Sequence, residues 1–169
     1  TDRLSTQILG SHQLSDNTAL TVKNSVSFFE REIDIPGYTF AGRQTSSFSE
    51  VNIATSLAKT EWVAGANLWT ENFKQQQGDS SQDLSFTNYT AGVFAQNIWD
   101  IQEQWTLETG LRTDYQSDYG VFVLPRLSLM FEPTNLLTFR IGGGMGYKTP
   151  TVFTEDVERL QFRSVQPIN

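Results

Sequence analysis

The sequence predicts an all-β fold in which about eight antiparallel strands run up and down, in meander order, as part of a transmembrane β-barrel. Three observations predict it: apolar and polar residues alternate through the second half, aromatic residues gather beside short connections, and short turns alternate with longer polar stretches. A helical membrane span is excluded, because no run approaches the roughly 18 apolar residues that it needs. Successive side chains of a strand point to opposite faces, so the alternation predicts a sheet with one apolar and one polar face.

Turn-forming residues divide the chain into strands. Four short connections are rich in such residues, at 15–18, 59–60, 100–103 and 132–135. Longer and more polar stretches separate the other strands, at 35–45, 76–86, 116–120 and after 148. The strands expected between these connections are 2–13, 18–33, 46–58, 61–74, 87–99, 104–115, 120–132 and 136–148.

The first four strands alternate less regularly than the last three. In the first three, apolar residues recur at every second position, as at Val51, Ile53 and Leu57. In the fourth, apolar residues occupy both phases between Trp62 and Trp69. A β-bulge or a patch covered by protein would produce this mixture, and the sequence leaves both explanations open.

The last three strands carry apolar residues at most odd positions and polar, charged or glycine residues at most even ones. The odd set is expected to face lipid and includes Trp105, Leu107, Leu111, Tyr115, Val121, Val123, Leu127, Leu129, Phe131, Leu137, Phe139, Ile141, Met145 and Tyr147. The charged even set is expected to face the lumen and comprises Glu108, Arg112, Asp114, Arg126, Glu132, Arg140 and Lys148. On the lipid side, an Arg or Lys at mid-membrane depth would cost about 2–4 kcal/mol. The alternative is that these residues form cross-strand charge pairs on a solvated face, worth about 1 kcal/mol or less each.

Aromatic residues add a length scale to the pattern. Trp105 and Tyr115 bracket about ten residue steps of roughly 3.3 Å, and a tilt of roughly 40° gives a vertical span of about 25 Å, the height of an outer-membrane apolar band. Trp62, Trp99 and Phe131 stand beside short connections, as interfacial aromatic residues do. The half-buried sheet of a soluble sandwich would also alternate and carry aromatic residues, so a soluble carbohydrate-binding sandwich is an alternative.

Composition excludes several functions. The chain has 169 residues, a net charge of −7 and no cysteine, which removes disulfides, thiolate metal sites and cysteine nucleophiles. Its 12 basic residues are scattered rather than clustered, which disfavours nucleic acid as a partner. His12 is the only histidine, so neither an enzyme nor a metal site is expected. The glycines at 142–146 do not form a phosphate loop, because Tyr147 separates the last of them from Lys148, and no cofactor is expected.

The turn pattern also predicts orientation. Short turns of bacterial outer-membrane barrels lie on the periplasmic side, which would place both ends of this chain on the outer side. A complete barrel of this type is expected to start and finish in the periplasm, so we expect a slice of a larger wall. The first residues carry no signal-peptide pattern and already alternate, which agrees with an excerpt of a longer chain. The alternative is a complete eight-stranded barrel with a structural or adhesive role.

Four pieces in order, at hairpin spacing, carry a family resemblance. They are Gly-Val-Phe-Ala-Gln-Asn at 92–97, Leu-Glu-Thr-Gly-Leu-Arg-Thr-Asp-Tyr at 107–115, Leu-Pro-Arg-Leu-Ser-Leu at 124–129 (after Tyr-Gly at 119–120), and Gly-Met-Gly-Tyr-Lys-Thr-Pro at 144–150 (after Leu-Thr-Phe-Arg at 137–140). In this succession, residues 91–169 resemble the C-terminal half of the barrel domain of TonB-dependent outer-membrane receptors.

The resemblance implies a barrel of about 22 strands filled by a plug domain, with uptake driven through a plug segment that contacts the TonB protein. No plug is recognised in this sequence, so we expect 1–169 to be a single partial barrel domain in the cell outer membrane. The implied function is import of a scarce nutrient such as a metal chelate, a corrinoid or an oligosaccharide. Expected partners are outer-membrane lipid, the plug of the parent chain, the TonB complex through that plug, and the nutrient at loops 35–45, 76–86 and 148–169. The even charged set is expected to meet the plug.

Overall fold

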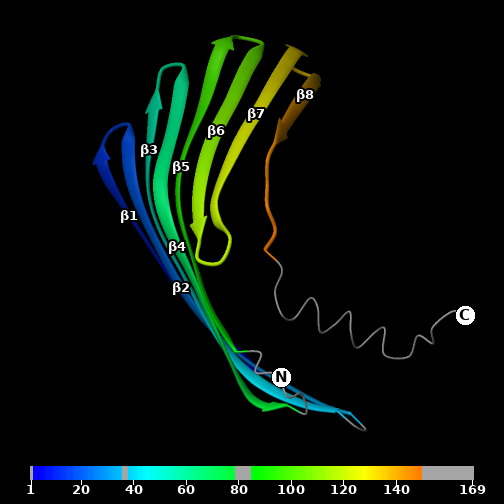
Figure 1. Ribbon diagram of the computed structural model, residues 1–169. Helices are drawn as coiled ribbons and strands as arrows, with labels where there is room; N and C mark the ends of the chain where they lie inside the picture. The colour runs from blue at the N-terminus through cyan, green and yellow to red at the C-terminus, as the bar shows by residue number, and fades with distance from the viewer. Residues whose placement is uncertain (1, 36–37, 79–84, 150–169) are drawn as a thin grey trace, which may run out of the picture.

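The computed structural model describes residues 2–35, 38–78 and 85–149, which form one antiparallel sheet (Figure 1). Each strand pairs with the next one in the sequence, so the sheet order is the chain order. The strands are β1 (Asp2–Ser15), β2 (Thr18–Ile35), β3 (Tyr38–Leu57), β4 (Thr60–Gly78), β5 (Phe86–Gln102), β6 (Trp105–Gln116), β7 (Gly120–Thr134) and β8 (Leu137–Gly144). The prediction of eight up-and-down antiparallel strands is confirmed.

The four short connections are also confirmed, and they lie together at one end of the sheet, uppermost in Figure 1. The longer connections are partly wrong. Residues 38–45 are strand, because the pairing of β2 with β3 continues without a shift to Ile35 and Tyr38. Likewise β4 runs to Gly78 and β5 begins at Phe86, while 79–84 and 36–37 lie outside the described residues. Backbone pairing does not require apolar side chains, so polar residues that read as loop can extend a strand.

The third longer connection, 116–120, is a tight turn. Gln116 Oε1 accepts hydrogen bonds from the backbone N–H groups of Asp118 and Tyr119, at 2.6 and 2.7 Å. Gly120 has a φ of 85°, in the left-handed region that glycine adopts without strain. The β6–β7 hairpin therefore ends early, and β2 to β5 extend past its tip (Figure 1).

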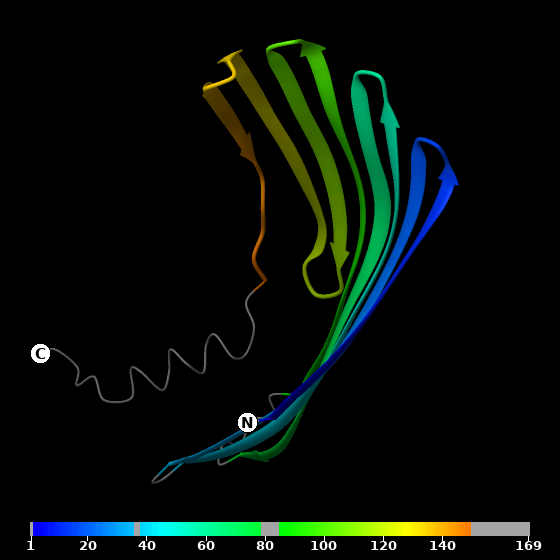
Figure 2. The same cartoon turned by 180° about the vertical axis from the view of Figure 1, so that it is seen from behind.

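The sheet is a single curved layer with two unjoined edges. In Figures 1 and 2 it bends along the strands, and residues 145–149 pass along the concave side. Within the described part of the chain β1 pairs only with β2 and β8 only with β7, so the alternative of a closed eight-stranded barrel is wrong. The sandwich alternative fails as well, because all the described strands belong to one sheet. The described residues contain no helix long and apolar enough to cross a membrane.

Strand register assigns the side chains to faces. Residues paired across the sheet share a face, so the odd residues of β5, β6, β7 and β8 lie on one side. Asp114, an even residue, contacts Tyr147 from the segment on the concave side, so the odd set lies on the convex side. Convex apolar residues are widely exposed, for example Val121 at 64% and Ile141 at 76%. The odd and even residues of β6 and β7 therefore lie on opposite faces of the sheet, as the alternation predicts.

No β-bulge accounts for the apolar residues that occupy both phases of β4. The pairing of β4 with β3 and with β5 shows no register shift between Trp62 and Trp69. Trp62 lies on the convex face, whereas Trp69 lies on the concave face and packs edge-on against Phe48, with ring centroids 5.9 Å apart and planes at 69°. The bulge explanation is therefore wrong, and aromatic residues occupy both faces of this strand.

The last strand is shorter than the predicted 136–148. β8 ends at Gly144, next to Pro125 of β7, whose carbonyl accepts a hydrogen bond of 3.0 Å from the N–H of Met145. The N and C=O of one residue point to the same side of a strand, so Pro125 would also have to donate toward Met145. Proline has no N–H, and the ladder stops there.

Candidate functional site

A row of polar residues crosses the concave face in the middle of the sheet. Lys23, Glu50, Asn67, Gly92 and Asp114 are direct cross-strand partners in β2, β3, β4, β5 and β6. The Nζ atom of Lys23 lies 3.2 Å from Glu50 Oε1. Strand pairing therefore brings residues of five strands into one row, although its first and last members, Lys23 and Asp114, lie far apart in the sequence.

Gly92 allows the two side chains beside it to approach each other. A Cβ atom on Gly92 would lie 2.3 Å from Asp114 Oδ1 and 2.8 Å from Asn67 Oδ1, closer than real Cβ atoms come. Asn67 and Asp114 thus fill the space above β5 that any other residue at 92 would occupy.

Arg112 joins these two side chains. Its Nε atom donates a 2.9 Å hydrogen bond to Asp114 Oδ2, and its Nη2 atom donates one of 3.2 Å to Asn67 Oδ1. Asp114 is 2% exposed and Asn67 is 7% exposed, so the charge of this carboxylate is balanced by the guanidinium in a largely dry site. The Nε atom of Arg112 also lies 2.8 Å from Asp114 Oδ1, so both carboxylate oxygens face the guanidinium, whereas Asn67 Nδ2 donates no hydrogen bond within the described chain.

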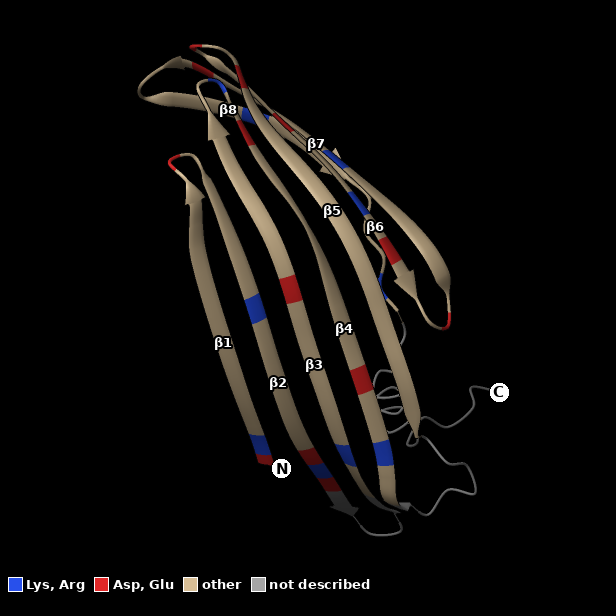
Figure 3. Ribbon diagram, turned by 90° about the vertical axis from the view of Figure 1, so that its left-hand side faces the viewer, with Lys and Arg blue, Asp and Glu red and all other residues tan. Residues whose placement is uncertain are grey.

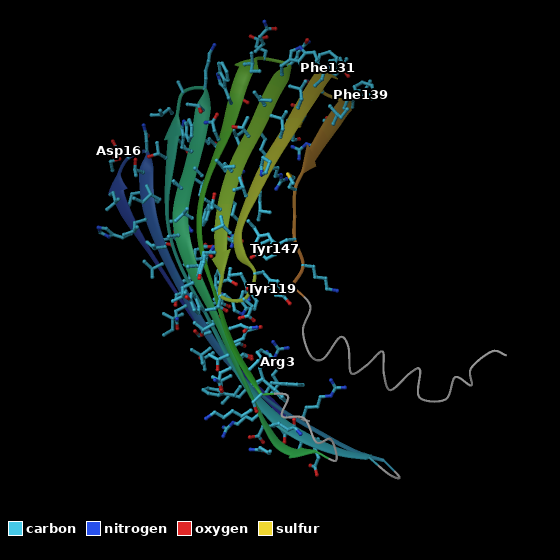
Figure 4. The ribbon with its side chains drawn as sticks, in the orientation of Figure 1. Arg3, Asp16, Tyr119, Phe131, Phe139 and Tyr147 are labelled. Carbon is cyan, nitrogen blue, oxygen red and sulfur yellow. The ribbon has the colours of Figure 1, made fainter. Side chains whose placement is uncertain are left out.

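Tyr147 covers this network from the segment that follows β8 (Figure 4). Its hydroxyl donates a 3.1 Å hydrogen bond to Asp114 Oδ2, and its ring stacks on Phe122 of β7 with centroids 4.0 Å apart and planes at 2°. Burial raises the pKa of Tyr147 above its ordinary value of 10.0, and the hydrogen bond to Asp114 and the negative charge of that residue add to the effect. The prediction that Met145 and Tyr147 belong to the lipid-facing set is wrong, because β8 ends before them and both lie on the concave side.

A hollow of about 360 Å³ lies beside this network. Charged and amide groups line it from several strands, and Met145 contributes to its wall from the segment after β8. Glu108 ties two neighbours together near the hollow: its Oε1 atom lies 3.4 Å from Arg126 Nη2 and accepts a 3.3 Å hydrogen bond from Gln96. Its lining residues include Glu50, Gln96, Arg112, Leu124, Arg126 and Met145.

The structure places the predicted site residues unequally. Glu108, Arg112, Asp114, Arg126 and Arg140 share the concave face, and the first four gather around the network and the hollow. Arg140 lies nearer the short turns, where its Nη2 atom is 3.5 Å from Met130 Sδ.

The two remaining predicted residues lie apart. Glu132 stands beside the β7–β8 turn and accepts a 3.1 Å hydrogen bond from Thr138 Oγ1. Lys148 is exposed and lies beyond β8, because the strand does not reach it. Sequence reasoning missed Asn67, and the signal for it was a polar residue in the mixed-phase part of β4.

Charged residues have an uneven distribution along the strands. Figure 3 shows few of them along the middle of β1 to β5 and a concentration at the strand ends away from the short turns. Two of the charged residues at these strand ends, Arg43 and Glu30, form an ion pair in which Arg43 Nε and Glu30 Oε1 are 3.3 Å apart. Among the described residues, no group of three or more acidic, histidine or cysteine side chains is arranged to hold a metal ion.

Comparison with known proteins gives one family and one fold. The family model for the TonB dependent receptor-like β-barrel matches residues 1–157. Among solved structures, a variant of the ferric enterobactin receptor PfeA from Pseudomonas aeruginosa is similar, with a TM-score of 0.64 and 18% sequence identity. That match covers 89% of this chain and 26% of the PfeA chain. None of the curated proteins matches the sequence.

Proposed function

The chain belongs to the family of TonB-dependent receptor β-barrels, and we propose that it forms part of the barrel wall of an outer-membrane receptor that imports a scarce nutrient. The family is one of receptors and transporters and not a class of enzymes. The chain spans about a quarter of the length of the solved receptor that it resembles, 26%, so import by the whole protein is part of the proposal.

The observation that carries the proposal is the contrast between the two faces of a single layer. Convex side chains such as Val93, Leu127 and Ile141 are 56–76% exposed, whereas the concave face holds the Arg112–Asp114 ion pair. In water, so much exposed apolar surface would be unfavourable by roughly 25 cal/mol per Å². In a bilayer the same side chains contact hydrocarbon, and the charged face meets the lumen.

Aromatic pairs mark both borders of the proposed apolar band on the convex face. Trp105 and Phe131 stack with centroids 4.2 Å apart beside the short turns, and Tyr89 and Tyr115 lie 6.0 Å apart near the other end. From Trp105 to Tyr115 the strand rises about 25 Å after allowance for tilt, which matches an outer-membrane apolar band. Two girdles at this separation support a membrane-spanning wall.

We place the short turns in the periplasm and the far ends of β2 to β5 outside the cell. Short periplasmic turns are the rule for outer-membrane barrels, and the charged strand ends lie on the opposite side, where water is available. Ligand contacts are then expected where β2 meets β3 and β4 meets β5. These junctions replace the loops 35–45 and 76–86 of the sequence prediction, since most of 35–45 and both ends of 76–86 are strand. The third predicted loop, 148–169, lies outside the described residues from 150 onward.

The lumen-facing set meets a plug domain of the parent chain in this proposal, and the plug in turn contacts the TonB complex. The members of the lumen-facing set are Glu108, Arg112, Asp114, Arg126 and Arg140 in the sheet, Glu132 near the periplasmic rim and Lys148 after β8. A metal chelate, a corrinoid or an oligosaccharide is the expected class of nutrient. The solved relative is named for ferric enterobactin, and at 18% identity it supports the fold and not the ligand.

Two neighbouring cysteine substitutions in the complete barrel of the receptor, with the plug deleted so that reagent can enter the lumen, test the placement of the faces. Arg126→Cys lies on the concave face and Leu127→Cys on the convex face, and the 169 residues contain no native cysteine to interfere. In outer-membrane vesicles of a plug-deleted receptor, a water-soluble maleimide should label position 126 and leave position 127 unlabelled. A lipid-soluble maleimide should label position 127. Equal labelling of both by the water-soluble reagent would contradict the proposal.

Growth on candidate nutrients tests the import itself. A strain without the receptor gene should lose growth when one scarce metal chelate, corrinoid or oligosaccharide is the sole source of the needed element or carbon. Return of growth with the receptor, and not with a receptor that lacks its plug's TonB contact segment, is the expected result. Unchanged growth of the deleted strain on all three classes would refute the import function.

A further inference from the structure

Residues 145–149 leave the sheet because of a residue on the neighbouring strand. Continued pairing of β8 with β7 would set Met145 opposite Pro125 and Tyr147 opposite Val123. Pro125 accepts from the N–H of Met145 but has no N–H to donate in return. The chain after Gly144 is therefore released from the ladder and crosses the concave face instead (Figure 4).

Tyr147 is the residue that attaches this released segment. Its ring lies parallel to Phe122, and its hydroxyl reaches past β7 to Asp114 on β6. Asp114 Oδ2 accepts from both Tyr147 and Arg112, so the phenol completes a network that already joins β4 to β6. No strand register would bring residue 147 to residue 114, because a whole strand separates them.

The attachment also changes what is accessible on the concave face. In a single layer most side chains are half-exposed, yet Asp114 is 2% exposed beneath the phenol. Met145, on the same segment, forms part of the wall of the hollow that Glu50, Arg112 and Arg126 line. Detachment of Tyr147 would therefore uncover Asp114 and open one side of the hollow.

We propose that Tyr147 is a latch residue, which holds residues 145–149 over the concave face and whose release opens the hollow to the plug domain. The proposal rests on the proposed function, because the plug is the partner that would enter. The entering group is a hydrogen-bond donor such as a guanidinium or an amide. Asp114 Oδ2 accepts from a donor that the segment supplies, so another donor could take the place of the phenol on this oxygen. A plug donor would compete with the phenol for this carboxylate.

Maleimide labelling of a cysteine in the hollow measures the release. Leu124→Cys in the full-length receptor supplies the reporter, since Leu124 lines the hollow. Adding Tyr147→Phe removes the hydroxyl and keeps the ring, so the labelling rate should rise about tenfold, as expected for loss of one hydrogen bond to a charged group. Tyr119→Phe, in the adjacent β6–β7 turn, is the matched control and should leave the rate unchanged.

Hydrogen exchange gives a second reading on the same proteins. Amides of residues 145–149 should exchange faster in the Tyr147→Phe receptor than in the wild type. Equal labelling rates and equal exchange in the two proteins would overturn the latch. A cysteine at Leu127, on the convex face, separates this outcome from failure of the proposed function. If water-soluble maleimide labels positions 124 and 127 alike, the barrel placement fails, whereas a difference between them with no effect of Tyr147→Phe refutes the latch alone.

Discussion

Substitution of Gly92 by alanine should damage the concave network and destabilise the wall. The new Cβ atom would lie 2.3 Å from Asp114 Oδ1 and 2.8 Å from Asn67 Oδ1, so at least one of these side chains must move. Overpacking of this kind costs about 1–3 kcal/mol, and loss of the Arg112–Asn67 hydrogen bond adds about 1 kcal/mol. Removal of a strand glycine returns about 0.5–1 kcal/mol. The expected net loss of unfolding free energy is about 2 kcal/mol.

Urea unfolding of the full-length receptor in lipid vesicles measures this loss as a lower midpoint. Gly110→Ala is the matched control, because Gly110 lies on the concave side of the next strand and its Cβ would be 3.7 Å from the nearest atom, an ordinary contact. The free energy of unfolding of Gly110→Ala should lie within about 0.5 kcal/mol of the wild-type value.

A double substitution tests whether the cause is the carboxylate. In an Asp114→Ala background the contact at 2.3 Å is gone, so Gly92→Ala should cost less there than in the wild type, with a coupling of about 1 kcal/mol or more. Equal costs of Gly92→Ala in both backgrounds would refute the steric reasoning. So would a loss from Gly110→Ala as large as that from Gly92→Ala.

Three further changes have defined outcomes. Pro125→Val restores a backbone donor opposite the carbonyl of Met145, and hydrogen exchange should show a protected amide at residue 125. The pKa of Tyr147 is raised, so its contact is present below the usual value of about 10 and is lost as pH rises through the raised pKa. The labelling rate at Leu124→Cys, divided at each pH by the rate of a free thiol, should then increase at alkaline pH, and Tyr147→Phe should abolish that increase. Leu127→Arg on the convex face should cost about 2–4 kcal/mol of stability in vesicles, measured by urea unfolding, whereas a solvated position would show little change.

The number of strands and the short turns could be predicted because the signals are local. Asp16 and Asn17, or Pro133 and Asn135, favour a turn whatever lies elsewhere in the chain. The alternation of β6 and β7 is local as well, and it identified both faces. Strand ends were harder to predict. Residues 38–45 include polar residues that are typical of a loop, and they are strand because they form hydrogen bonds with β2, which the segment itself does not reveal.

The site depended on relations that no single segment contains. Asn67, Gly92 and Asp114 lie side by side only through the register of three strands. Tyr147 continues an apolar alternation in its own segment, yet it turns inward because of Pro125 on another strand. The alternation of residues depends on one strand alone, so it predicts which face each side chain occupies. The end of pairing depends on the neighbouring strand as well, so the alternation does not predict it.

The strictly sequential pairing of β1 to β8 has a consequence for how such a wall is assembled. Each hairpin needs only the strand made just before it, so growth can proceed from one moving edge without waiting for distant parts of the chain. At β8 that edge offers only eight residues, Leu137–Gly144, before the chain turns away. A hairpin that paired with β8 would find a short template near the short turns, and the rest of its length would have to be aligned by contacts other than those with β8.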